Sequence, residues 1–205
     1  SQMEQLSKSI AHLPLTIEPR NVGMKLDLDW ALALQANTSA IERRCSSFPG
    51  RRSIKKEHQA AWLARSVSCI DLTTLSGDDT AGRVRRICAK ARQPVRQDIL
   101  NRIGLPNLKT GAVCVYHDMV GFAVEALKGT DIPVAAVSTG FPAGLSPLRL
   151  RIEEIHESVK AGASEIDIVI SRRHVLTQNW QALYDEVAAF RAACGDAHVK
   201  VILAT

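Results

Sequence analysis

The sequence predicts an α/β fold in which parallel strands curve into a (β/α)8 barrel. Its 205 residues are 46% hydrophobic and 23% charged, which suits one globular unit with a sizeable core. Short apolar segments alternate with amphipathic helical segments, as in βαβ units with parallel strands. The expected strands are Val67–Leu72, Ala112–Tyr116, Val134–Val137, Glu165–Ile170 and Val199–Leu203.

Two observations favour a closed barrel over an open, doubly wound sheet. An open sheet predicts a glycine-rich turn after its first strand, whereas the turn from Thr73 to Thr80 contains one glycine and two aspartates. Several strands also carry polar residues at alternate positions, as strands of a TIM barrel do where a site occupies the interior. Five strands cannot close an eight-stranded barrel, and the chain ends directly after the apolar run 201–204. We therefore expect the first five strands of a truncated barrel, in a fragment of a longer protein.

The chain divides into three expected regions. Residues 1–24 mix Pro14, Pro19 and polar residues without periodicity, which predicts a loosely ordered tail. Residues 25–66 are expected to form an N-terminal helical extension. Residues 67–205 are expected to form the partial (β/α) barrel.

Two helices are expected in the extension. The first starts with Asp27 or Asp29 as its N-cap. Its apolar residues are Trp30, Leu32 and Leu34. The second covers residues 54–65. Its apolar side holds Trp62 and Leu63. The basic segment 46–53 is expected to be the loop between the two helices.

In the barrel region, helices separate the strands. They are expected at about 79–92, 118–128, 148–161 and 179–193. Asp78 or Asp79 can cap the first of them. Gly162 follows the third helix at the C′ position, where a glycine commonly ends a helix.

Charged residues inside two neighbouring strands are the strongest candidates for a functional site. Because side chains alternate along a strand, Asp167 shares one face with Glu165 and Val169. A carboxylate among isoleucines and valines is costly unless it is paired. Lys200 on the next strand faces the same interior if the valines on either side of it face the helices, which brings it within charge-pairing reach of Asp167. A structural ion pair is the alternative, but strand-borne charges that face a barrel interior favour a site.

Further candidates lie on and after the first three strands. Asp71 and Thr73 share a face with Cys69, and Asp71 either anchors the following loop or belongs to the site. Cys114 is interpreted as a small core residue rather than a nucleophile, because no activating base is evident. The loop Gly140–Gly144 is either part of the site rim or an ordinary turn.

Charge and residue usage narrow the class of protein. The net charge is +5, but only 4% of residues are aromatic, which disfavours a nucleic-acid surface. The basic surface either attracts a phosphorylated metabolite or has no partner at all. No apolar run approaches the roughly 18–20 residues that span a bilayer. The six histidines lack metal-ligand spacing. Five widely spaced cysteines suit a reducing compartment, so a cytoplasmic location is expected.

Six stretches resemble the deoxyribose-phosphate aldolases, in order and at the spacing of that family. They are Ile70–Thr80, Ala112–Tyr116, Val137–Gly144, Glu165–Ile170, Leu176–Glu186 and Lys200–Thr205. The resemblance covers about residues 25–205 and is strongest to the animal-type branch, which has an N-terminal extension like residues 25–65. One departure is His117, because many members have proline after the tyrosine.

The resemblance implies a class I aldolase that needs no metal or other cofactor. Family members cleave 2-deoxy-D-ribose 5-phosphate to D-glyceraldehyde 3-phosphate and acetaldehyde through a lysine Schiff base. By resemblance, Asp167 matches the proton-shuttling aspartate and Lys200 matches an interior lysine beside it, so both are expected to be catalytic. Asp71, Thr73 and Cys114 match residues that line the substrate pocket.

The resemblance also implies what to expect of activity and partners. The family's Schiff-base lysine lies on a sixth strand, in a Lys-Thr-Ser-Thr-Gly segment beyond Thr205, and its phosphate-binding loops follow strands seven and eight. We expect an active aldolase of deoxyribonucleotide and carbohydrate catabolism, of which this chain is one part. An inactive fragment with an interaction or regulatory role is the alternative. The expected partner is a small phosphorylated sugar; a homo-oligomer is compatible with the sequence, and neither nucleic acid nor membrane is expected.

Overall fold

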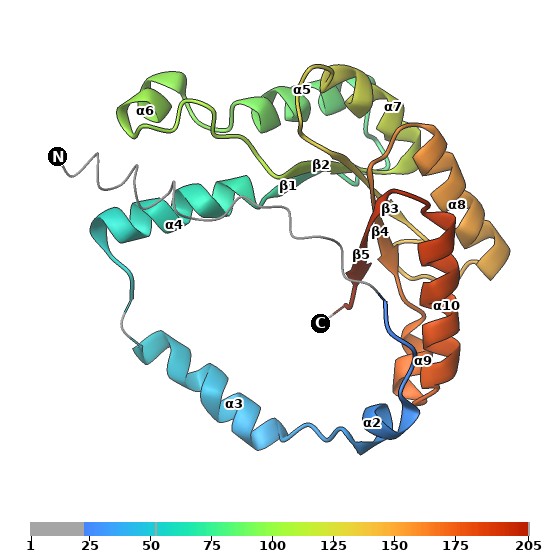
Figure 1. Ribbon diagram of the computed structural model, residues 1–205. Helices are drawn as coiled ribbons and strands as arrows, with labels where there is room; N and C mark the ends of the chain where they lie inside the picture. The colour runs from blue at the N-terminus through green and yellow to red at the C-terminus, as the bar shows by residue number, and fades with distance from the viewer. Residues whose placement is uncertain (1–22, 52, 205) are drawn as a thin grey trace.

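The computed structural model describes residues 23–51 and 53–204. They form a five-stranded parallel sheet in which the strands are neighbours in chain order, β1-β2-β3-β4-β5 (Figure 1). The strands are β1 (Asp71–Thr73), β2 (Ala112–Val115), β3 (Val134–Ser138), β4 (Glu165–Val169) and β5 (His198–Ile202). This confirms the predicted α/β fold with parallel strands. The tail predicted for residues 1–24 lies outside the described residues, apart from Gly23 and Met24.

Helices follow the strands. They are α5 (Ala81–Arg92), α6 (Gln97–Arg102), α7 (His117–Ala126), α8 (Leu148–Lys160), α9 (Arg172–Leu176) and α10 (Trp180–Ala193). The long helices α5, α7, α8 and α10 cover the outer, convex side of the sheet (Figure 1). The four long helices lie close to their predicted positions, whereas the short helices α6 and α9 were not predicted. Gly162 follows α8 with a φ of 103°, a left-handed conformation that costs glycine little. Within the described ranges, no helix has the length and apolar character needed to cross a membrane.

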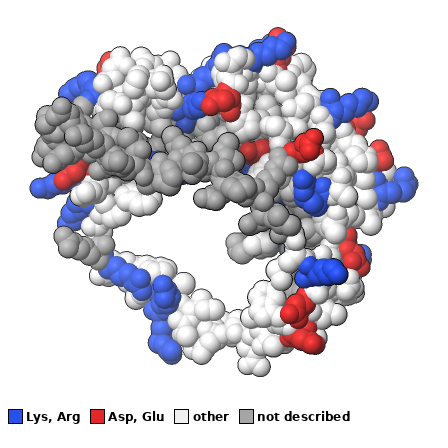
Figure 2. All heavy atoms as spheres, in the orientation of Figure 1, with Lys and Arg blue, Asp and Glu red and all other residues white. Residues whose placement is uncertain are grey.

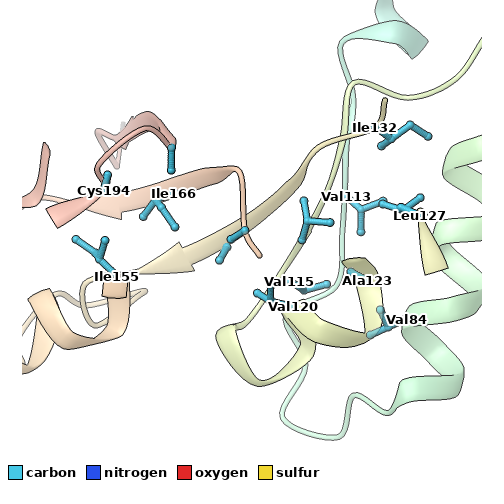
Figure 3. Close-up of a cluster of buried hydrophobic side chains, with 14 of the residues drawn as sticks. Val84, Val113, Val115, Val120, Ala123, Leu127, Ile132, Ile155, Ile166 and Cys194 are labelled. Carbon is cyan, nitrogen blue, oxygen red and sulfur yellow. The ribbon is translucent and has the colours of Figure 1, made fainter. Parts of the chain in front are cut away.

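The main hydrophobic core lies between the sheet and these helices (Figure 3). Alternate residues of each central strand point into it. They are Val113 and Val115 from β2, Ala136 from β3, and Ile166 and Ile168 from β4. The helices contribute Val84, Val120, Ile155 and Phe190, all fully buried. Burying a large apolar side chain contributes roughly 1.5–3 kcal/mol, so this core holds the helices against the convex face.

The other strand residues point to the concave face of the sheet. A smaller apolar cluster there consists of Cys114, Ala135 and Val137, packed against Leu75, Tyr116 and Phe141. On the same face, Lys200 of β5 forms an ion pair with Asp71 of β1. Because β1 and β5 are the two edges of the described sheet, their contact means that the sheet is strongly curved, as the strands of a barrel are.

The first strand begins later than predicted. Helix α4 (Lys56–Ser68) includes Val67, and β1 starts only at Asp71. Cys69 directly follows the helix, and its N–H donates to the carbonyl of Ser66 at 3.0 Å. The prediction that Cys69 shares a strand face with Asp71 is therefore wrong, because the helical hydrogen bonds continue through the residues expected to open the strand.

Helix α5 begins with a different cap from the one predicted. The side chain of Thr80 accepts a hydrogen bond from the N–H of Arg83 at 3.3 Å. Asp79 instead accepts from Oγ1 of Thr74 at 2.8 Å, and Asp78 pairs with Arg83. Both aspartates therefore stabilise the turn after β1, which leaves the capping position to the threonine.

The described residues of the N-terminal extension contain three α-helices where two were predicted. They are α2 (Leu28–Ala33), α3 (Thr38–Ser47) and α4, with the short 3-10 helix η1 (Phe48–Gly50) between α3 and α4. Asp27 caps α2 as predicted, because its side chain accepts from the N–H of Trp30 at 2.9 Å. Asn37 is the N-cap of the next helix, α3, because its side chain accepts a hydrogen bond from the N–H of Ala40 at 3.0 Å. The loop predicted for 46–53 is shorter as a result.

The extension lies across an open hollow from the concave side of the sheet, with basic side chains along α3 (Figure 2). It contacts the barrel part at α10, where the hydroxyl of Tyr184 donates to the carbonyl of Met24 at 2.9 Å. Trp62 and Leu63, predicted on the apolar side of their helix, remain 55% and 61% exposed. Of this helix only Ala64 is buried, so the periodicity marks a side that the described residues do not cover.

Candidate active site

The concave face carries an ionic cluster of one lysine and three carboxylates. The Nζ atom of Lys200 lies 2.9 Å from Oε2 of Glu165 and 3.2 Å from Oδ1 of Asp167. The same ammonium pairs with Asp71, so the cluster draws on β1, β4 and β5. The predicted charge pair between Asp167 and Lys200 is confirmed, and the structure adds two carboxylates to it.

Strand register explains why these side chains meet. Asp167 and Lys200 are directly paired in the parallel β4–β5 register. Because Ile166 and Ile168 point into the helix-covered core, the residue between them must point to the concave face. Glu165 lies two residues earlier on that face, so it reaches the same ammonium from the amino-terminal end of β4.

The environment of Lys200 favours its charged form. Burial by itself would lower the pKa of the ammonium, but hydrogen bonds to Asp71 and Glu165, together with the charge of Asp167, raise the pKa above its ordinary value. At neutral pH the side chain therefore stays protonated. A protonated amine has no free electron pair, so Lys200 suits the role of a fixed positive charge and not that of a nucleophile.

The environment of Asp167, in contrast to that of Lys200, disfavours the charged form of the side chain. Burial raises the pKa of this carboxyl above its ordinary value; the charge of Lys200 lowers it in part, and the nearby negative charge of Asp71 raises it further. A carboxyl group whose pKa lies closer to neutrality takes up and releases protons more readily under working conditions. The cluster thus contains a fixed cation beside a group suited to proton transfer.

Cys114 adds a weak hydrogen-bond donor to the cluster. Its Sγ atom lies 3.6 Å from Oδ2 of Asp167, and the residue is only 3% exposed. Burial, reinforced by the negative charge of Asp167, raises the pKa of the thiol to about 12. The thiol therefore remains protonated, which fits the interpretation of Cys114 as a packed residue that lines the site and does not attack substrate.

This environment predicts slow modification of Cys114 by thiol reagents. Iodoacetamide at pH 8 is expected to alkylate the exposed Cys45 and Cys69 much faster than Cys114, because only the thiolate reacts. Peptide mapping by mass spectrometry over a time course measures each rate. Alkylation of Cys114 in the native protein as fast as that of Cys45 would contradict the assignment of a buried, protonated thiol.

Of the remaining predicted site residues, one belongs to the ionic cluster and the others lie beside it. Asp71 belongs to the cluster, which favours the site role over the loop anchor. Thr73 is exposed, and its hydroxyl donates to the carbonyl of Asp71 at 2.7 Å without touching Lys200. In the loop Gly140–Gly144, Phe141 packs into the concave apolar cluster. This loop therefore forms part of the wall beside the site.

Two features of the site were not proposed from the sequence. Glu165 was recognised only as sharing a face with Asp167, although that shared face was the signal that it joins the cluster. The apolar wall formed by Tyr116 and Phe141, with ring centroids 6.1 Å apart in an edge-on arrangement, was also missed. The two rings come from different loops, and no local pattern brings them together.

Comparison with known proteins identifies close sequence relatives. The family profile described as DeoC/LacD family aldolase matches residues 65–205. The chain is 54% identical over 187 residues to deoxyribose-phosphate aldolase of Bos taurus, covering 89% of this chain and 59% of the bovine protein. It is 52% identical over 189 residues to the Homo sapiens enzyme, covering 90% and 59%. The chain therefore spans 59% of the length of these relatives.

Solved structures agree on the fold. A putative deoxyribose-phosphate aldolase from Coccidioides immitis superposes with a TM-score of 0.60 and 24% identity, covering 87% of this chain and 62% of that one. Deoxyribose phosphate aldolase from Aeropyrum pernix superposes with a TM-score of 0.52 and 25% identity, covering 68% and 53%. The five described strands thus have the arrangement found in barrel aldolases.

Proposed function

Because the chain belongs to the DeoC/LacD aldolase family, we propose that the natural protein is a lyase that cleaves 2-deoxy-D-ribose 5-phosphate to D-glyceraldehyde 3-phosphate and acetaldehyde. The observation that carries the proposal is the cluster of Asp71, Glu165, Asp167 and Lys200 on the concave face. Its mixture of a fixed cation and a carboxyl with a raised pKa suits proton transfer to and from a sugar.

The proposed reaction proceeds through a Schiff base. An unprotonated lysine amine attacks the C1 aldehyde of the open-chain sugar and releases water, which forms an iminium ion. A base then removes the proton of the C3 hydroxyl. The C2–C3 bond breaks, its electron pair moves toward the iminium to form an enamine, and C3 becomes the aldehyde of D-glyceraldehyde 3-phosphate. Protonation of C2 and hydrolysis release acetaldehyde and restore the amine.

We assign roles in this reaction to the residues of the ionic cluster and of the substrate pocket. Asp167, through a water molecule, takes the hydroxyl proton and returns a proton to C2. Lys200 stabilises the negative charge of that carboxylate and orients it. Asp71, Thr73 and Cys114 line the substrate pocket. By resemblance, the Schiff-base lysine is a different residue on a sixth strand, which agrees with the raised pKa of Lys200.

Reductive trapping tests this division of roles. Treating the full-length protein with 2-deoxy-D-ribose 5-phosphate and sodium borohydride is expected to produce a covalent adduct, because borohydride reduces the iminium to a stable amine. Peptide mapping is expected to find Lys200 unmodified, since its ammonium is held by three carboxylates. An adduct on Lys200, or no sugar-dependent adduct at all, would refute the proposed mechanism.

The proposal extends to the setting of the enzyme. A small phosphorylated sugar is the partner; neither nucleic acid nor a membrane is required. The structure from Aeropyrum pernix is described as tetrameric, and we propose a homo-oligomer here as well. We further propose a cytoplasmic location and a role in deoxyribonucleotide and carbohydrate catabolism. Residues 25–66 are proposed to act as a helical extension attached to the barrel of residues 67–205.

A further inference from the structure

A second ionic cluster lies outside the proposed site, between α8, α10 and the carboxyl ends of β3 and β4. Its centre is Arg151 of α8, which is only 2% exposed. Nη1 of this guanidinium lies 2.7 Å from Oε1 of Glu186 on α10 and donates to Oγ of Ser171 at 3.0 Å. The N–H of Ser171 donates to the second oxygen of Glu186 at 2.8 Å. Each group is therefore paired within the cluster.

The other nitrogens of Arg151 hold the ends of the two strands. Nε donates to the carbonyl of Thr139, directly after β3, at 2.7 Å. Nη2 donates to the carbonyl of Val169, the last residue of β4, at 2.8 Å. The hydroxyl of Thr139 also joins the strands, because it accepts from the N–H of Val169 at 2.8 Å and donates to its carbonyl at 3.1 Å. One side chain of α8 thus fixes two neighbouring strand ends.

The backbone of Thr139 is strained. Its φ is 60°, a left-handed conformation that is unfavourable for a β-branched residue. Such a conformation persists only where the surrounding structure enforces it. Here the hydrogen bonds from Arg151 and to Val169 supply that constraint. At the next residue, the N–H of Gly140 donates to Oε2 of Glu154, also on α8, at 2.7 Å.

The two segments that Arg151 holds, the loop after β3 and the end of β4, lead directly to the proposed site. We call Arg151 and its hydrogen bonds to Thr139 and Val169 the clamp. Along β4, Val169 is two residues from Asp167, on the same strand face. Along the loop after β3, Phe141 follows Thr139 by two residues and packs into the concave apolar cluster that contains Cys114. The thiol of Cys114 in turn contacts Asp167. The clamp is therefore connected to Asp167 in two ways, along β4 and through the loop after β3.

We propose that Arg151 is a positioning residue, which acts through Thr139 and Val169 to hold the loop after β3 and the end of β4 in the geometry that catalysis at Asp167 requires. This inference rests on the aldolase function proposed above. Arg151 is not among the residues proposed to touch substrate, because its guanidinium lies against Phe190 of the main core, on the helix-covered side of the sheet. Its effect is on the placement of groups that do.

The test uses variants of the full-length protein that remove hydrogen bonds of the clamp but keep the shape or the charge of the replaced side chain. Thr139→Val removes the hydroxyl but keeps the side-chain shape, and Thr139→Ser keeps the hydroxyl. Arg151→Lys keeps the charge beside Glu186 but loses the fork that reaches both carbonyls. The matched control is Ser158→Ala, which removes a buried hydroxyl on the same helix that has no hydrogen-bond partner among the described residues.

Two readouts separate positioning from simple loss of stability. Thr139→Val and Arg151→Lys are expected to lower kcat about 10- to 100-fold with little change in KM, because small misplacements of catalytic groups have effects of this size. Thr139→Ser and Ser158→Ala are expected to retain kcat close to that of the unmodified protein. Hydrogen exchange is expected to increase in peptides covering 139–144 and 165–171 in Thr139→Val and not in Ser158→Ala.

The outcomes distinguish the two proposals. An unmodified protein that does not cleave the sugar phosphate refutes the proposed function. A cleaving protein in which folded Thr139→Val keeps its kcat overturns the positioning role, as does an equal loss of kcat in Ser158→Ala. If Arg151→Lys does not fold, the comparison of Thr139→Val with Thr139→Ser decides, because both variants keep the buried ion pair with Glu186.

Discussion

Replacing Asp167 with asparagine in the full-length protein is expected to lower kcat for cleavage of 2-deoxy-D-ribose 5-phosphate by about 10²- to 10⁴-fold. Asparagine has nearly the same shape. With its single carbonyl oxygen at the position of Oδ1, it still accepts from Lys200, while its NH2 group takes the place of Oδ2 beside the thiol of Cys114. It cannot accept and return a proton at neutral pH. The variant therefore removes the chemistry of the carboxyl while it keeps the shape of the side chain and the contact with Lys200.

Steady-state kinetics together with a thermal melt measure this effect. The matched control is Asp98→Asn, which neutralises an exposed aspartate that pairs with Arg96 on the protein surface. The control is expected to keep normal turnover. Near-normal turnover of the Asp167→Asn variant would reduce Asp167 to a structural partner of Lys200. The Asp167→Asn variant is expected to keep a cooperative melt, because the shape of the side chain is retained, and loss of that melt would contradict this expectation.

Replacing Glu186 with glutamine is expected to lower the free energy of unfolding by about 3–5 kcal/mol, the usual cost of breaking a buried ion pair from one side. The neutral amide leaves the guanidinium of Arg151 buried without a counter-charge. Its NH2 group also replaces one of the two acceptor oxygens, so it faces either Nη1 of Arg151 or the N–H of Ser171, both of which are donors. Urea unfolding of the full-length protein measures the loss.

Glu157→Gln is the matched control, because Glu157 lies exposed on α8 and its ion pair with Lys160 at 3.5 Å is open to solvent. Little change in unfolding free energy is expected there. If both variants unfold at the same urea concentration, the buried pair does not contribute as proposed.

The same pair has a predicted pH dependence. Burial alone would raise the pKa of Glu186, but hydrogen bonds from Ser171 and Arg151 lower it below its ordinary value of 4.5. The stabilisation is therefore fully present above pH 4.5 and is lost as the pH falls through the lower value of the folded state. The difference in unfolding free energy between the wild type and Glu186→Gln is expected to shrink over that acidic range.

The strands and the direction of their side chains could largely be predicted from the sequence. Alternation along β4 placed Asp167 on the face opposite Ile166 and Ile168, and the structure agrees. The short helices α6 and α9 were missed, because helices of one or two turns have too few residues to show a period. The break between α2 and α3 was missed because Asn37, the cap of α3, gives a weaker signal than an apolar pattern that continues on both sides.

The sequence by itself determined which residues point toward the interior of the sheet and which family the motifs resemble, because both depend on order and spacing along the chain. Only the tertiary structure decided that Lys200 is shared among Asp71, Glu165 and Asp167. That sharing requires the curvature of the sheet, which brings the edge strands β1 and β5 together across its concave face. Likewise, the helical period could not predict a charge at Arg151 inside the core, because its partners lie on three other elements that only packing brings together.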